Sequence, residues 1–131
     1  KSKIKNNFFI GEMTKIPLPS NSIDYVISSH ALEPNGGEES KIAKELIRIC
    51  KKKIILFEPC YEKTKEKKIK DRIKKLGYVR NLESVFKKQG GNVESIFPLL
   101  NSIDRNNPTY CYIIQPTKKI KSDTKKITFS I

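Results

Sequence analysis

The chain has 131 residues, 37% hydrophobic and 31% charged, a balance typical of one globular domain and not of a disordered segment. Its 27 Lys and Arg residues outnumber 14 Asp and Glu residues, and the net charge of +13 would attract phosphates, RNA or anionic surfaces, unless the lysines only keep helix faces in solution. The three cysteines have no CxxC spacing, which argues against a disulfide framework and a zinc ribbon. No apolar run is as long as a membrane span, which argues against a spanning helix. We therefore expect a cytoplasmic protein with free thiols and no membrane contact.

The first part of the chain predicts two short strands with a turn region between them. Residues 8–10 (FFI) form an apolar run long enough only for a buried strand. Pro17 and Pro19 preclude regular structure in the segment that follows. The β-branched and aromatic residues of 23–29 (IDYVISS) then predict the second strand.

A helix, a buried strand and another helix are predicted next. Residues 38–52 repeat apolar side chains at i, i+4 and i+7, with acids in the first turn and lysines in the last. The apolar run 54–57 follows at once and is typical of a strand buried on both faces, as in a parallel sheet covered by helices. Residues 62–76 predict a second helix, and Gly77 stands where a left-handed residue would end it.

The last part predicts a short helix and two strands. Apolar residues within 82–86 indicate one or two further helical turns. Residues 93–97 and 110–115 predict strands, which we expect to be an antiparallel pair at one edge because no long helix joins them. The alternation of strands and helices predicts an α/β sheet. We assign residues 1–117 to one domain and expect residues 118–131 to be a basic, mobile tail.

Site candidates lie just after the strands, because ligands of open α/β sheets bind beyond the carboxyl ends of the strands. These positions hold Gly11, Glu12 and Met13, then Ser28, Ser29, His30 and Glu33, and then Glu58. His30 is the single histidine and would suit a general base, although a loop histidine bonded to the backbone is the plainer interpretation. Glu33 could equally cap a turn, and Glu58 could pair with a lysine. No HExxH, GxSxG, Walker lysine or GxGxxG motif is present.

The segment FFIGEMTKIPLPSNSIDYVISSHALEP resembles the middle of a class I S-adenosylmethionine-dependent methyltransferase of the broad type 11 group. That family typically reads strand, G-D-A, L-P-F, turn, S-F-D-x-V, and the matching residues here are GEM (11–13), IPL (16–18) and SIDYV (22–26). Farther on, KELIRICKKKIILFEP (44–59) is similar to the family's E-L-x-R-V-L-K-P-G-G-x-L-x-x-x-E-P, with lysines in place of the Pro-Gly-Gly turn. The resemblance is strong over residues 8–59 and extends beyond them only by element order.

The resemblance implies a Rossmann-like methyltransferase sheet with helices on both faces, S-adenosylmethionine as cofactor and methyl transfer to an unidentified acceptor. Glu12 would accept a hydrogen bond from the adenine amino group, with Gly11 and the backbone of Met13 beside the ring. The methionine end of the cofactor and the substrate entrance would be lined by Ser28, Ser29 and His30. His30 would also be the catalytic base, with Glu33 a weaker second candidate.

One departure concerns the cofactor loop. The family's acidic residue followed by G-x-G-x-G is absent, as is the second strand, so the chain corresponds to strands three to seven. Because the family's third strand pairs with the second and the fourth with the first, two strand edges would be left unpaired. Three explanations stay open: a piece of a longer chain, an edge covered by a partner such as a second copy, or a non-catalytic relative with repacked strands. We expect these residues alone to bind S-adenosylmethionine weakly or not at all.

Two other classes of function remain as alternatives. The missing loop would suit a non-catalytic binding or scaffold domain. The basic run KEKKIKDRIKK (65–75) would suit an RNA-binding module, but no aromatic residues are interleaved with it to stack bases. We therefore expect any RNA binding to be weak and to collapse with added salt.

Overall fold

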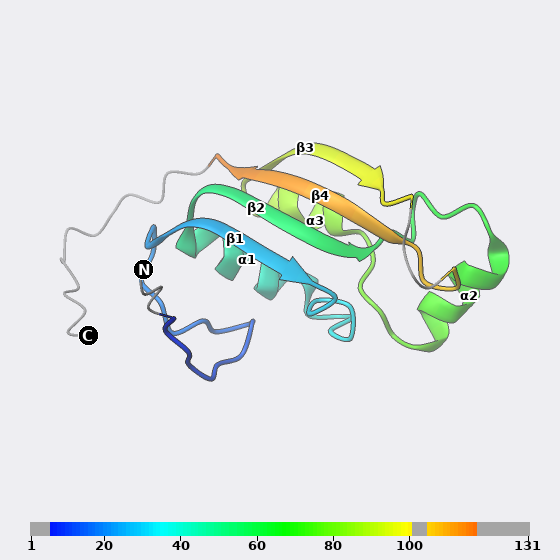
Figure 1. Cartoon of the computed structure of the whole chain (residues 1–131), viewed down its shortest axis with the longest axis horizontal. Coiled ribbons are helices and arrows are strands. Elements are labelled where there is room, and N and C mark those ends of the chain that lie inside the picture. Colours follow the sequence, from blue (N-terminus) through cyan, green and yellow to red (C-terminus); the bar gives the residue numbers. More distant parts are fainter. Residues whose placement is uncertain (1–5, 101–104, 118–131) are drawn as a thin grey trace, which may run out of the picture.

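The computed structural model describes residues 6–100 and 105–117, which form a four-stranded mixed sheet with helices (Figure 1). The strands are β1 (Ile23–Ser29), β2 (Cys50–Pro59), β3 (Gly91–Pro98) and β4 (Thr109–Pro116). The sheet order is β1-β2-β4-β3: β1 and β2 are parallel, and β4 lies antiparallel between β2 and β3. The expected antiparallel pairing of the last two strands is confirmed. The tail expected at residues 118–131 lies outside the described residues.

Three helices accompany the sheet: α1 (Glu39–Ile49), α2 (Lys67–Lys75) and α3 (Leu82–Lys88). The helix α1 ends three residues before the predicted end at residue 52, because Cys50 is already extended and pairs with Ile23 of β1. The helix α2 begins later than expected and ends as predicted, since Gly77 adopts a left-handed φ of 66°. No helix in the described ranges is long and apolar enough to cross a bilayer.

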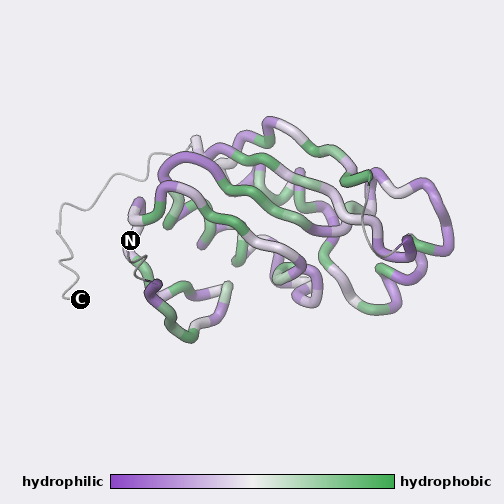
Figure 2. The backbone as a smooth tube through the Cα atoms, in the orientation of Figure 1, coloured by the Kyte–Doolittle hydropathy of each residue, from purple (hydrophilic) through white to green (hydrophobic). Residues whose placement is uncertain are grey.

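One face of the sheet is covered by α1 and α3, which lie side by side behind it in Figure 1. Ile54 and Leu56 of β2 and Tyr112 and Ile114 of β4 point to this side and are almost completely buried. The hydrophobic residues lie mainly along the strands and under these helices, whereas the α2 region at the carboxyl end of β2 is mostly hydrophilic (Figure 2). We call this side the covered face.

The opposite side, here called the open face, carries the residues that alternate with those of the covered face. A row of Ile27, Ile55 and Ile113 runs across β1, β2 and β4 as directly paired residues. Ile27 is 67% exposed and Phe97 of β3 is 43% exposed. The helices expected on both faces are therefore found on one face only within residues 6–100 and 105–117.

The strand predicted at residues 8–10 is wrong. These residues form no strand, and the side chains of Phe8 and Ile10 are 90% and 100% exposed. A strand needs a neighbouring strand to hydrogen-bond its backbone, and β1 is paired on the β2 side alone within the described residues. The segment after it is fixed differently: Arg48 of α1 donates hydrogen bonds to the carbonyls of Ile16 and Leu18, at 2.9 and 2.7 Å.

Candidate functional site

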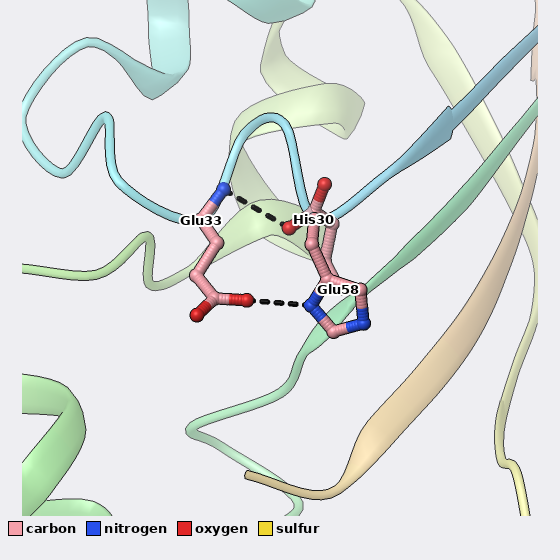
Figure 3. A group of neighbouring side chains, drawn as sticks. All are labelled: His30, Glu33 and Glu58. Atoms are coloured by element: carbon pink, nitrogen blue, oxygen red, sulfur yellow. Dashed lines mark hydrogen bonds and ion pairs between the residues drawn. The ribbon is translucent and has the colours of Figure 1, made fainter. Parts of the chain in front are cut away.

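Three ionisable side chains meet where β1 and β2 end (Figure 3). His30 directly follows β1, Glu33 lies in the turn after it, and Glu58 is the last residue but one of β2. One nitrogen or oxygen atom of each residue lies within 4.8 Å of those of the other two. Ligands of α/β sheets bind at this end of the strands, so we treat these residues, the His30 group, as the candidate site.

The imidazole of His30 is held at both ring nitrogens. Nδ1 lies 2.5 Å from Oε2 of Glu33, and Nε2 lies 3.0 Å from Oγ1 of Thr109. The backbone of His30 has a φ of 54°, which is uncommon for a residue with a side chain, and its N–H donates to the carbonyl of Phe57 at 2.8 Å. The side chain is still 40% exposed. An oriented imidazole that is bonded to a carboxylate and reachable from solvent can accept or donate a proton.

Glu58 fixes the turn that carries Glu33. It is fully buried, and its two carboxylate oxygens accept hydrogen bonds from the backbone N–H groups of Leu32 and Glu33, both at 3.0 Å. Burial raises the pKa of Glu58 to about 7, while these hydrogen bonds and nearby His30 act in the opposite direction. The lysine partner considered from the sequence is therefore wrong, because backbone amides satisfy this carboxylate.

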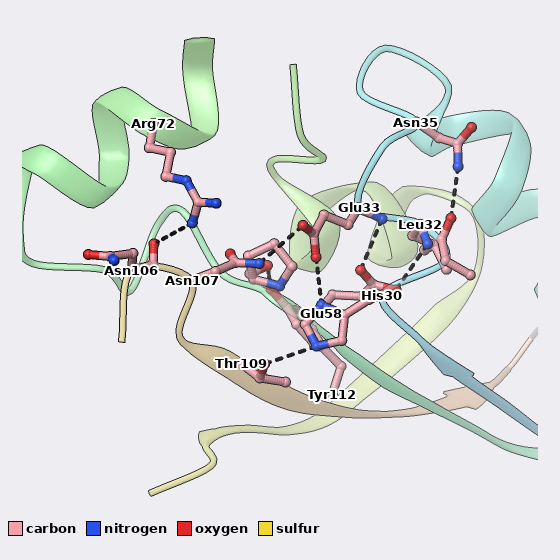
Figure 4. A network of polar contacts seen from close by, with 12 residues as sticks. His30, Leu32, Glu33, Asn35, Glu58, Arg72, Asn106, Asn107, Thr109 and Tyr112 are labelled. Carbon is pink, nitrogen blue, oxygen red and sulfur yellow. Dashed lines mark hydrogen bonds and ion pairs between the residues drawn. The ribbon is translucent and has the colours of Figure 1, made fainter. Parts of the chain in front are cut away.

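The loop before β4 closes the site from the other side (Figure 4). Asn107 Nδ2 donates a hydrogen bond to Oε1 of Glu33 at 3.1 Å, so that both carboxylate oxygens of Glu33 are held. Thr109 contacts the far nitrogen of His30. Neither residue was predicted from the sequence, because they are separated from their partners by 74 and 79 positions and no spacing rule connects them.

The geometry of the His30 group fits a hydrogen-bonded pair better than a metal centre. Two ligands on one ion are roughly 3 Å apart or more when the metal–ligand bonds are about 2.1 Å. Nδ1 of His30 and Oε2 of Glu33 are closer than that, at 2.5 Å. Both oxygens of Glu58 are already occupied by backbone N–H groups.

The other residues predicted for the site lie in different settings. Gly11 and Glu12 are exposed, and Glu12 forms an isolated bridge with Lys15, whereas Met13 packs against the core. Ser28 places its Oγ in the covered face, buried and without a hydrogen-bond partner in the part of the chain that the structure describes. Ser29 is exposed at the end of β1. The structure thus brings His30 and Glu33 together, and no described hydrogen bond joins Glu12 to them.

Comparison with known proteins gives a fold but no close relative. No protein-family model and no curated protein matches the sequence. A methyltransferase dependent on S-adenosylmethionine from Methanosarcina mazei is similar over 89% of this chain and 70% of its own, with a TM-score of 0.66 and 15% identity. A candidate sarcosine dimethylglycine methyltransferase from Galdieria sulphuraria is similar over 84% of this chain and 58% of its own, with a TM-score of 0.64 and 12% identity. The chain has a class I methyltransferase-like fold.

Within this methyltransferase-like fold, the chain spans a little over half the length of several solved chains that it matches. Another of these is the [4+2]-cyclase SpnF, which is similar over 85% of this chain and 56% of its own, with a TM-score of 0.61 and 10% identity. At such identities the likeness shows the fold alone, and a cyclase among the neighbours illustrates that a fold does not determine a reaction. The chemistry of this chain therefore depends on its own side chains, foremost those of the His30 group.

Proposed function

We propose that this chain is part of an S-adenosylmethionine-dependent methyltransferase and acts within a longer chain or an assembly. The observation that carries the proposal is the methyltransferase-like sheet with the His30–Glu33 pair at the carboxyl ends of its parallel strands. The acceptor is not specified by these residues.

The described residues do not fit the whole cofactor. We propose as cofactor contacts the residues Gly11, Glu12, Met13, Ser28, Ser29 and His30. No G-x-G-x-G turn follows the parallel strands within the described ranges: the connection from β1 to α1 contains only the pair Gly36-Gly37, and β2 leads into Cys60 and Tyr61. Phosphate-like and ribose groups of nucleotides are commonly held by such turns. We therefore expect the missing contacts to come from outside residues 6–117.

His30 is our candidate base for an acceptor that loses a proton from an O–H or N–H group. It would accept that proton at Nε2, the nitrogen that contacts Thr109. Glu33 would stabilise the resulting imidazolium through Nδ1, and Asn107 keeps the Glu33 carboxylate in place. Glu58 would act as a positioning residue through the backbone of the turn.

The open face, and the edge of β1 that pairs with no strand in the described residues, support the proposal that further structure completes the sheet. Exposed apolar side chains such as Ile27 and an unpaired strand edge favour association with another segment. That segment would come from a longer form of this chain, from another protein or from a second copy.

The role of His30 is tested by measuring methyl transfer with the native protein, including any chain that precedes or joins these residues. We expect His30→Ala to lower the rate of methyl transfer by about 10²–10⁴-fold and to flatten its pH dependence. Lys88→Gln, on the exposed side of α3, is the control and should leave both unchanged. Unchanged turnover of His30→Ala at every pH would contradict the assignment.

A second experiment concerns the incompleteness of the cofactor site. Calorimetric titration of the 131-residue chain with S-adenosylmethionine should give no saturable binding at micromolar concentrations. Tight stoichiometric binding would contradict the proposal that the site needs further residues.

A non-catalytic scaffold is the second candidate function, and it is favoured because no G-x-G-x-G turn occurs in the described residues. The native assembly discriminates between the two candidates. If it folds normally yet binds no S-adenosylmethionine, the scaffold is supported and the methyltransferase is not.

A further inference from the structure

Three cationic side chains gather around one aromatic ring beyond the carboxyl end of β2. Lys70 Nζ lies 4.8 Å from the centre of the Tyr61 ring, Lys74 Nζ lies 5.4 Å from it, and Arg80 Cζ lies 5.8 Å from it. The lysines come from α2, Arg80 from the segment between α2 and α3, and Tyr61 from the turn after β2. We call these four residues the Tyr61 cluster.

The cationic groups of the Tyr61 cluster form no ion pair in the part of the chain that the structure describes. Lys70 and Lys74 are four residues apart on one helix, a spacing at which like charges repel. Within residues 6–100 and 105–117, no carboxylate is bonded to the side chains of Lys70, Lys74 or Arg80. The nearby acids serve backbone groups instead: a Glu62 oxygen accepts from the Asn81 N–H, and a Glu39 oxygen from the Arg80 N–H.

The aromatic ring offsets only part of this repulsion. A cation over the face of a tyrosine is stabilised by roughly 0.5–1 kcal/mol at an exposed site. Lys74 and Arg80 are exposed and Lys70 is half-buried, so an incoming anion can reach the cluster from solvent. A tetrahedral dianion with several acceptor oxygens is attracted to two ammonium groups and a guanidinium more strongly than a single carboxylate is.

The Tyr61 cluster and the His30 group lie at the same end of the sheet. Tyr61 follows Glu58 by three positions, and the N–H of Val79, next to Arg80, donates to the carbonyl of Glu33 at 3.0 Å. The cluster is therefore attached, through the segment before α3, to the turn that carries Glu33, at the end of the sheet where the proposed base lies.

We propose that Tyr61, Lys70, Lys74 and Arg80 bind the phosphate group of a phosphorylated methyl acceptor, an inference that rests on the proposed function. The cluster holds the phosphate by charge, and the reacting O–H or N–H group of the same molecule lies toward His30. RNA is the less favoured ligand, because the ammonium groups over Tyr61 occupy ring surface on which a base would stack.

The test is a titration of the 131-residue chain with inorganic phosphate, followed by NMR of the backbone amides at constant ionic strength. We expect saturable shifts at Tyr61 and Arg80, and much weaker shifts with acetate. A triple variant should lose at least about tenfold in phosphate affinity; it combines Lys70→Gln, Lys74→Gln and Arg80→Gln. The matched control removes three exposed lysines elsewhere and should stay within about twofold; it combines Lys44→Gln, Lys51→Gln and Lys88→Gln.

Three outcomes would overturn the inference. Equal losses in the two triple variants would mean that phosphate responds only to net charge. Equal binding of acetate and phosphate would remove the phosphate class. Binding of oligouridylate that persists at high salt and is lost in Tyr61→Leu would make the cluster a stacking site for RNA. Phosphate binding needs neither cofactor nor turnover, so its failure leaves the methyltransferase proposal standing, and a failure of methyl transfer leaves the phosphate measurement intact.

Discussion

The two faces of the sheet differ in how far this chain stabilises them by itself. On the covered face, α1 and α3 bury Ile54, Leu56 and Tyr112 almost completely. On the open face, the paired residues Ile27, Ile55 and Ile113 of the same strands are half-buried or exposed, with Ile27 at 67%. The strands are the same in both cases. The difference teaches that one layer of helices gives this sheet a core, whereas the other side carries apolar residues that no described helix covers.

The largest expected effect compares two isoleucines on these faces. Ile54→Ala should lower the free energy of unfolding by about 2–5 kcal/mol, because it opens a cavity between β2 and the helices. Ile27→Ala should cost about 1 kcal/mol or less, since that side chain is mostly in water. Urea denaturation of the 131-residue chain measures both. Similar losses would show that the open face is covered in solution.

A second prediction concerns Glu58, the carboxylate of the covered face. Its pKa is raised from 4.5 to about 7 in the folded chain, so between these values the folded state binds more protons than the unfolded state. The free energy of unfolding should therefore fall as pH rises through this window, by at most about 3 kcal/mol from this group. Glu58→Gln should remove that slope, and Glu83→Gln on exposed α3 should retain it. An identical slope in Glu58→Gln would contradict the raised pKa.

A smaller effect is expected where residues 16–18 are fixed to α1. Arg48→Gln should lower the free energy of unfolding by about 1–3 kcal/mol, because it leaves two carbonyls and the carboxylate of Glu45 without this donor. Lys87→Gln removes an exposed pair with Glu83 and should cost less than about 0.5 kcal/mol.

The Arg48–Glu45 pair gives the stability a pH dependence of opposite sign to that of Glu58. The hydrogen bond from Arg48 lowers the pKa of Glu45 below 4.5, so its stabilisation is present above that value and is lost as pH falls through the folded pKa. Acid titration of wild type and Arg48→Gln, followed by circular dichroism, should show the wild type losing more stability. Equal acid sensitivity would mean that the ion pair contributes nothing.

Local patterns were enough to predict most of the elements. The apolar spacing of α1, the β-branched run of β1 and the left-handed glycine after α2 depend on residues close together in the chain, and each was located from them. Part of the site was accessible for the same reason, since His30 and Glu33 are three residues apart. Asn107, Thr109 and the partners of Glu58 were not, because those contacts join segments far apart in the chain.

The sequence by itself determined the periodicities, the carboxyl-end positions of His30 and Glu33 and a net charge of +13. Only the tertiary structure decided that residues 8–10 form no strand, that Tyr61 lies among three cations, and that one face of the sheet is covered. The physical reason is common to all three. Strand pairing, charge clustering and burial are interactions between segments, and their free energy depends on which neighbour is present rather than on the residue's own preference.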